Sequence, residues 1–119
     1  MKLNELKLEQ KDLELIIKVE EMGDPRQVTT QLDDNFHDVC EVYCGDESAS
    51  VFLTLWDEKI QEMQKGNYYK LSNCYTNEFR GSLRLNISKF GKIEKIQGDF
   101  EINTANNLSL KEIQGNTLL

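Results

Sequence analysis

Three aromatic residues stand at the ends of strand-like segments where the hydrophobic pattern predicts exposure to water: Trp56, Tyr75 and Phe79. In residues 51–56 the odd positions form an unbroken apolar row. Successive side chains of a strand point to opposite faces, so Trp56 lies off that row. A small acidic domain does not place its sole Trp there without a partner to cover it. Flat rings exposed on a sheet can stack on nucleic-acid bases, and each such contact is worth about 1–3 kcal/mol.

Two arginines accompany these rings, and strand alternation places Arg80 and Arg84 on the same outer face as the aromatic side chains. A guanidinium group can pair with a phosphate through two parallel hydrogen bonds, and it can also stack on a base. Weaker candidates for contacts to a nucleic-acid backbone, from strand and loop positions, are Lys70, Lys89, Lys92 and Arg26.

Each of these residues also has an ordinary structural interpretation. Trp56 could plug the end of a barrel beneath residues 57–64, while Tyr75 and Phe79 could simply fill the core. Any single basic residue is usually a solvated surface charge. Two arginines beside two aromatic residues make the binding interpretation about as strong as that alternative.

Charge is distributed unevenly along the chain. Its net charge is −7 at pH 7, which opposes a polyanion at long range. Residues 1–65 carry 7 basic and 16 acidic groups, a net charge of −9, whereas residues 66–119 carry 7 and 5, a net charge of +2. Salt screens charges beyond roughly 8 Å, so a basic face in the second half can still attract phosphates at short range.

The elements that must position these side chains are short strands of a single domain. Acidic residues at the start of 57–64 and Gly66 after its end predict a short helix, with Ile60 and Met63 facing the barrel end. Residues 76–78 are expected to be a connector, and Gly91 to permit a sharp bend. The predicted strands cover residues 13–19, 36–44, 49–56, 68–75 and about 82–96, and residues 28–30 could extend a strand along the first loop.

Several function classes find no support in the sequence. No run approaches the roughly 18 apolar residues needed to cross a membrane, and the first residues have no secretory signal pattern. Three cysteines leave one unpaired, which fits a reducing intracellular setting. No nucleophile arrangement, phosphate-binding glycine loop or cofactor motif occurs, so we expect neither an enzyme nor a bound cofactor.

A metal site at His37, Cys40 and Cys44 is disfavoured for two reasons. Strand alternation puts the two cysteines on one face and His37 on the other, and a fourth ligand is missing. Buried small hydrophobic side chains account better for both cysteines, and Cys74 is expected to be a small wall residue.

A series of short motifs then resembles a known family. The motifs are Gly45-Asp46-Glu47, Leu53-Thr54-Leu55-Trp56, Lys65-Gly66 and Tyr75-x-x-x-Phe79-Arg80-Gly81-x-Leu83-x-Leu85-Asn86. In order and spacing they resemble the simple single-stranded-DNA-binding proteins of archaea and the related eukaryotic subunit of the sensor-of-single-strand-DNA repair complex. The similarity runs from about residue 13 to residue 96. The eukaryotic branch often places another aromatic residue where this chain has Asn86.

The resemblance implies an all-β fold, a five-stranded Greek-key OB-fold barrel over residues 1–98 with one short helix between the third and fourth strands. Residues 99–119 would be a C-terminal extension, either docked or partly disordered. In that family the aromatic residues that match Trp56, Tyr75 and Phe79 stack on bases, so the resemblance implies the same role for these three residues.

We therefore expect a monomer that binds single-stranded DNA with little sequence preference, in the nucleus or the cytoplasm, during replication or repair. Two alternatives stay open: an OB-fold subunit used mainly to dock a protein scaffold in a repair or replication complex, and a binder of single-stranded RNA.

Overall fold

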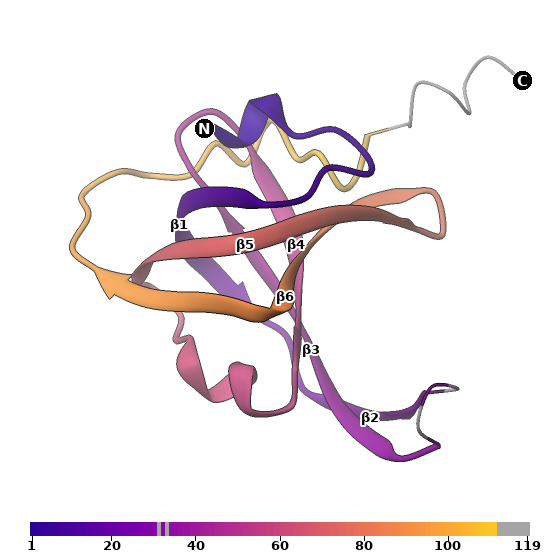
Figure 1. Cartoon of the computed structure of the whole chain (residues 1–119). Helices are drawn as coiled ribbons and strands as arrows, with labels where there is room; N and C mark the ends of the chain where they lie inside the picture. The colour runs from indigo at the N-terminus through magenta and orange to yellow at the C-terminus, as the bar shows by residue number, and fades with distance from the viewer. Residues whose placement is uncertain (31, 33, 112–119) are drawn as a thin grey trace, which may run out of the picture.

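The computed structural model describes residues 1–30, 32 and 34–111. Strands dominate it, and two short 3-10 helices accompany them (Figure 1). No helix in these residues is long and apolar enough to cross a membrane. In chain order the elements are η1 (Leu3–Glu5), β1 (Leu13–Met22), β2 (Arg26–Thr29), β3 (Phe36–Gly45), β4 (Ser50–Trp56), η2 (Asp57–Glu62), β5 (Tyr68–Phe79) and β6 (Ser82–Ile96).

One sheet, in the order β1-β5-β6-β4-β3-β2, closes into a barrel because β1 also pairs with β3. Most neighbours are antiparallel, but β4 and β6 run parallel and share only the short register from Phe52↔Arg84 to Thr54↔Asn86. The predicted OB-fold is confirmed, with the short helix between β4 and β5. The additional strand β2 pairs with β3 and lengthens a hairpin that projects beyond the barrel (Figure 1).

Alternation along the strands builds the core. In β4, Val51, Leu53 and Leu55 are buried while Phe52 and Thr54 are half-buried, so the predicted inward row is confirmed. The row of Cys40, Val42 and Cys44 in β3 is buried in the same way. Each buried aliphatic side chain stabilises the barrel by about 1.5–3 kcal/mol relative to an exposed one. The opposite row of each strand is left to form the outer surface.

A bulge at Asn73 reverses the alternation within β5. The register against β1 passes from Leu15↔Leu71 to Leu13↔Cys74, so β5 carries one extra residue there. Asn73 adopts a φ of 56°, a left-handed conformation that Asn tolerates better than most residues. Before the bulge the odd positions of β5 face the core, and after it the even positions do. Tyr75, Asn77 and Phe79 therefore point outward.

The expected connector at residues 76–78 is wrong, because β5 continues to Phe79 and pairs with β6 throughout. The chain reverses instead in a two-residue turn, where Arg80 and Gly81 have φ values of 51° and 80°. Positive φ at both central positions matches the right-handed twist of a hairpin, and glycine accepts it without steric cost. Tyr75 and Phe79 consequently lie on one continuous strand.

The segment after β4 is a 3-10 helix, shorter than the predicted 57–64. Its first turn carries Asp57 and Glu58, and Met63 just beyond its end is buried against the barrel while Ile60 is half-buried. The bend predicted at Gly91 is confirmed by the register, in which residues 88–91 of β6 oppose Asn73 alone. A Cβ on Gly91 would lie 2.4 Å from Cγ2 of Ile87, so this position requires glycine for space.

Residues 103–109 lie against the barrel between the starts of β4 and β6. Asn107 forms a parallel bridge with Ser50, whose N–H donates to the carbonyl of Asn106. The Ser109 hydroxyl donates to the Leu83 carbonyl at 2.6 Å and accepts from the Phe52 N–H at 2.9 Å. The boundary between residues 1–98 and 99–119 stays a prediction, and the part of the extension from 112 to 119 lies outside the described residues.

The bulge predicts a specific response to substitution. Asn73→Val should lower the free energy of unfolding by about 1–3 kcal/mol, because a β-branched residue strains a left-handed backbone. Asn73→Gly should leave it within about 0.5 kcal/mol of wild type, since glycine adopts this φ freely. Urea denaturation followed by circular dichroism measures both. Equal losses in the two variants would show that the Asn side chain, rather than the backbone conformation, stabilises the bulge.

Candidate nucleic-acid interface

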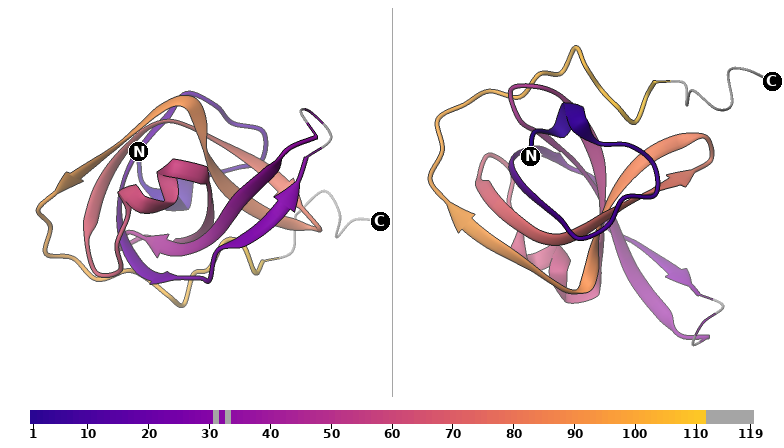
Figure 2. Two further views of the ribbon diagram at one scale, coloured as in Figure 1. Left: turned by 90° about the horizontal axis from the view of Figure 1, so that it is seen from below. Right: turned by 45° about the horizontal axis from the view of Figure 1, so that its top comes forward.

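A groove of about 360 Å³ crosses the outer face of β3 and β4. The β2–β3 hairpin and the β5–β6 hairpin project toward the same side of the barrel (Figure 2). Both hairpins contribute residues to the lining of the groove. One side contributes Arg26 and Val28 from β2, and the other contributes Phe79 and Arg80 from the β5–β6 turn. The remaining lining residues, from β3, β4, β5 and β6, are Val39, Cys40, Glu41, Thr54, Trp56, Asn77, Arg84 and Asn86.

Trp56 lies at the end of β4 with 39% of its surface exposed. Its indole packs against the His37 ring in a T-shaped arrangement, with ring centroids 6.1 Å apart and planes at 79°. His37 Nδ1 lies 2.8 Å from Oδ2 of Asp57, whose Oδ1 accepts a hydrogen bond from the Asp38 N–H. The residue directly after Trp56 thus ties the end of β4 to β3, and this linkage limits the orientations open to the indole.

Phe79 faces the groove from the opposite side and is 44% exposed. The Arg80 guanidinium carbon lies 5.1 Å from the centre of its ring, and that of Arg84 lies 5.5 Å away. Both distances fall within the range of cation–π attraction. Two exposed aromatic rings and two guanidinium groups therefore share one groove.

Tyr75 is half-buried and lies two residues before Asn77 on the same outward face of β5. It does not line the groove itself, but it forms a cross-strand pair with Asn86, which does. Asn86 is buried, and its Nδ2 donates to Oδ1 of Asn77 at 3.0 Å. This amide pair thus forms the groove wall between Tyr75 and Phe79.

Arg84 is held within the protein on several sides. Its guanidinium carbon lies 5.0 Å from the Phe52 ring, and its Nε donates to Oγ of Ser82 at 3.0 Å. Its Nη1 forms an ion pair with Oε2 of Glu41. Only 16% of the Arg84 side chain is exposed, whereas half of the Glu41 side chain is. By contrast, no described carboxylate pairs with Arg26 or Arg80.

The other three basic candidates lie elsewhere. Lys70 is on the outer face of β5, where Nζ is 3.6 Å from Oε1 of Glu14. Lys89 is exposed at the bend of β6, 5.7 Å from the centre of the exposed Phe90 ring. Lys92 lies just past that bend, opposite Ser72. The structure therefore brings together Trp56, Phe79, Arg26, Arg80 and Arg84, with Tyr75 adjacent, but not these lysines.

Sequence reasoning missed several residues of the groove, although a signal for them existed. Once Cys40 and Val42 are assigned to the core, alternation places Val39 and Glu41 on the face shared with Trp56. The same argument applied to β6 gives Asn86. No sequence signal was available for Asn77, because its outward direction depends on the bulge at Asn73.

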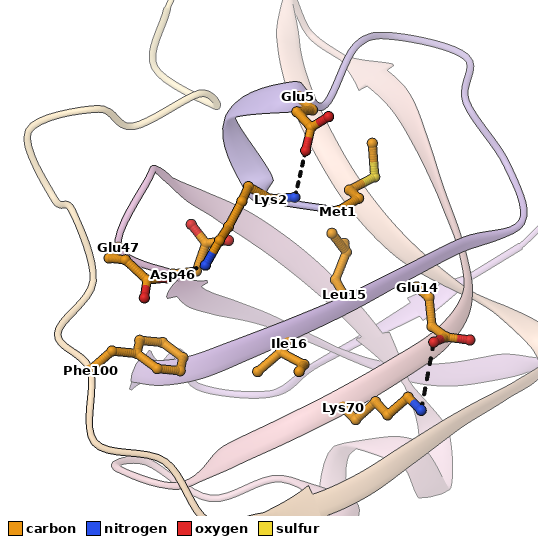
Figure 3. Close-up of a pocket in the computed structure, with 10 residues that line it drawn as sticks. All are labelled: Met1, Lys2, Glu5, Glu14, Leu15, Ile16, Asp46, Glu47, Lys70 and Phe100. Carbon is orange, nitrogen blue, oxygen red and sulfur yellow. Dashed lines mark hydrogen bonds and ion pairs between the residues drawn. The ribbon is translucent and has the colours of Figure 1, made fainter.

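A larger hollow of about 760 Å³ lies beside the N-terminus and shares no lining residue with the groove (Figure 3). Its basic groups are already paired, Lys2 with Glu47 and Lys70 with Glu14. Two further carboxylates, Glu5 and Asp46, line it as well. Because acidic groups outnumber basic ones, this hollow would repel a phosphate backbone despite its size.

The three cysteines are free and buried. Burial raises the pKa of the Cys74 thiol to about 12 and also raises the pKa values of Cys40 and Cys44. A thiol with a raised pKa is a poor nucleophile and a poor metal ligand at neutral pH. Among the described residues, no three His, Cys, Asp or Glu side chains come together as a metal site would require.

Residues 6–95 match the model of the family described as single-stranded DNA binding protein Ssb-like, OB fold. The chain belongs to this family. It is 29% identical over 98 residues to the single-stranded DNA binding protein Ssb of Saccharolobus solfataricus, a match that covers 82% of this chain and 65% of that protein. The chain thus spans somewhat less than two thirds of that relative's length. The description of this family names single-stranded DNA as the ligand of its members.

Solved structures give the same fold. A hypothetical protein from Arabidopsis thaliana, known from its solution structure, is 26% identical with a TM-score of 0.78, covering 94% of this chain and 83% of that one. A replication protein A heterotrimer bound to single-stranded DNA matches with a TM-score of 0.68 at 14% identity, covering 87% of this chain and 27% of that one. The second likeness concerns the fold alone.

The exposure of Trp56 predicts a small structural role. Trp56→Ala should lower the free energy of unfolding by about 1 kcal/mol, mainly through the lost contact with His37. Leu55→Ala, at the neighbouring buried position, should cost about 2–5 kcal/mol. Circular dichroism in urea measures both variants. A loss for Trp56→Ala as large as that for Leu55→Ala would mean that the indole is a plug of the barrel end.

Proposed function

We propose that the groove between the two hairpins binds single-stranded DNA with little sequence preference. The observation that carries this proposal is the placement of Trp56 and Phe79, two half-exposed rings, in one groove with three arginines. Every base has a π-face, so stacking on these rings tolerates any sequence. A single OB-fold covers roughly 4–16 nucleotides in this way.

The groove residues divide into three roles. Trp56 and Phe79 stack on bases at its two sides, and Tyr75 extends the stacking surface along β5. Arg26 and Arg80, at the two hairpins, hold phosphates on either side of the stacked bases. Arg84 contacts the backbone from within the groove. Lys89 and Lys92 make weaker backbone contacts outside the groove, at and just past the bend of β6, while Lys70 is already paired with Glu14 beside the acidic hollow.

The acidic character of the chain limits the strength of this interaction. A net charge of −7 repels DNA at distances that salt does not screen. The arginines act only within roughly one Debye length, about 8 Å. Binding should therefore depend more on stacking, and less on charge, than in a basic protein of the same fold.

A role at exposed strands in replication or repair follows as part of the same proposal, supported by the similarity to the archaeal single-stranded DNA binding protein. Association with a protein scaffold would supply the long-range attraction that this chain lacks. Stacking alone does not separate DNA from RNA, so the test below includes both.

An oligothymidine of about 25 nucleotides should quench the fluorescence of the sole tryptophan, because a stacked base contacts the indole directly. Phe79→Ala should weaken binding by about 1–3 kcal/mol, roughly five- to 150-fold. Phe90→Ala removes a ring that is 79% exposed outside the groove lining and should change the affinity little.

Titration at low salt with oligothymidine and with oligouridine measures these affinities. An absence of quenching at tens of micromolar protein with either ligand would contradict the proposal. Stronger binding of oligouridine would reassign the ligand to RNA while keeping the groove. Equal losses in Phe79→Ala and Phe90→Ala would remove the groove from the binding site.

The salt dependence of the binding affinity should show whether the arginines contact phosphates. For single strands, log K falls against log salt with a slope of about −0.7 per neutralised phosphate. Arg80→Asn, which suits the positive φ of that turn, should make the slope shallower by about 0.7. Lys95→Gln removes the same charge from an exposed position outside the groove and should leave the slope near wild type. Identical slopes in both variants would exclude Arg80 from the phosphate contacts.

A further inference from the structure

The groove contains one residue whose charge opposes the proposed ligand. Among its lining residues, all within the described part of the chain, Glu41 carries the sole carboxylate, and the cations are Arg26, Arg80 and Arg84. Glu41 lies opposite Thr54 in the pairing of β3 with β4, on the face shared with Trp56. Half of its side chain is exposed, so a bound strand would meet this carboxylate directly.

Glu41 also pairs with the Arg84 guanidinium, the group that a phosphate would bind. Its Oε2 pairs with Nη1 of Arg84, while Nε of Arg84 donates to Ser82. The guanidinium carbon also lies within cation–π range of two rings, 5.0 Å from the centre of Phe52 and 5.5 Å from the centre of Phe79. A carboxylate and a phosphate both offer oxygen acceptors to an arginine, so a phosphate that binds Nη1 of Arg84 must replace the Glu41 carboxylate there.

We propose that the Glu41 carboxylate competes with the nucleic-acid phosphate for Arg84 and sets the affinity of the groove. The strand binds Arg84 by displacing Glu41, which then turns to water through its exposed side. The ion pair can open on the Glu41 side, because half of that side chain is exposed to water. This inference rests on the proposed function, because it names how the same groove is regulated.

Two consequences distinguish this arrangement from a simple basic groove. In the free protein Arg84 stays ordered by the rings and by Ser82, so its entropy is already lost before the ligand arrives. In the wild-type complex the gain from the phosphate is reduced by the lost pair with Glu41 and by repulsion from its carboxylate. Neutralising Glu41 should therefore strengthen binding, whereas loss of a merely structural contact would weaken it.

The test compares Glu41→Gln with Glu47→Gln, using oligothymidine and the fluorescence of Trp56. Glu47 pairs with Lys2 and lines the other hollow, so its substitution makes the same change in net charge away from the groove. Glu41→Gln should bind about fivefold more tightly at low salt than Glu47→Gln. Its salt dependence should be steeper by about 0.7, equivalent to one further phosphate.

A double-mutant cycle assigns the effect to Arg84. In an Arg84→Ala background, the gain from Glu41→Gln should shrink to that of Glu47→Gln. An undiminished gain there would mean that Glu41 acts by bulk repulsion and would overturn the competition. If the wild-type protein binds DNA but Glu41→Gln binds no more tightly than Glu47→Gln, the competition for Arg84 is also overturned. If wild type and every variant failed to bind at low salt, the proposed function itself would fail with it.

Discussion

The reversal of alternation at Asn73 is the constraint on which the rest of the groove depends. Without the extra residue, β5 would keep its odd positions inward to the end, and Tyr75, Asn77 and Phe79 would enter the barrel. The interior has no room for three such side chains beside Leu85, because protein cores are close-packed. The bulge therefore moves the odd positions of β5 from the core, before Asn73, to the outer face beside the groove, after it.

The groove combines an apolar stacking surface with three arginines and a single carboxylate. Phe52 and Phe79 order the Arg84 guanidinium, and Glu41 neutralises it. Such a surface favours ligands that supply both flat rings and anions, since neither feature alone satisfies it. The acidic hollow on another part of the barrel carries the opposite selectivity. The local charges of the groove and of the hollow, rather than the net charge of the chain, would therefore decide where a polyanion binds.

Sequence patterns predicted the inward rows and the direction of Trp56, because these depend on residues within one strand, whereas the barrel followed from the resemblance to a known family. They misplaced the β5–β6 turn, since a connector and a paired strand differ through partners distant in sequence. They also grouped Lys70 with the arginines, although its cross-strand surroundings include Glu14. The pairing of Arg84 with Glu41 joins residues 43 positions apart, and only the closed sheet brings them together.

The contacts of Ser109 have a consequence for the limits of the folding unit. β4 and β6 share three register pairs, so the barrel has a short seam between these strands. A single hydroxyl spans the open end of that seam by joining the Phe52 N–H to the Leu83 carbonyl. The family match ends at residue 95, yet Asn107 and Ser109, which lie beyond it, bond to the starts of β4 and β6. Residues 107–109 are thus bonded into the wall of the barrel, beside the two strands that line the groove.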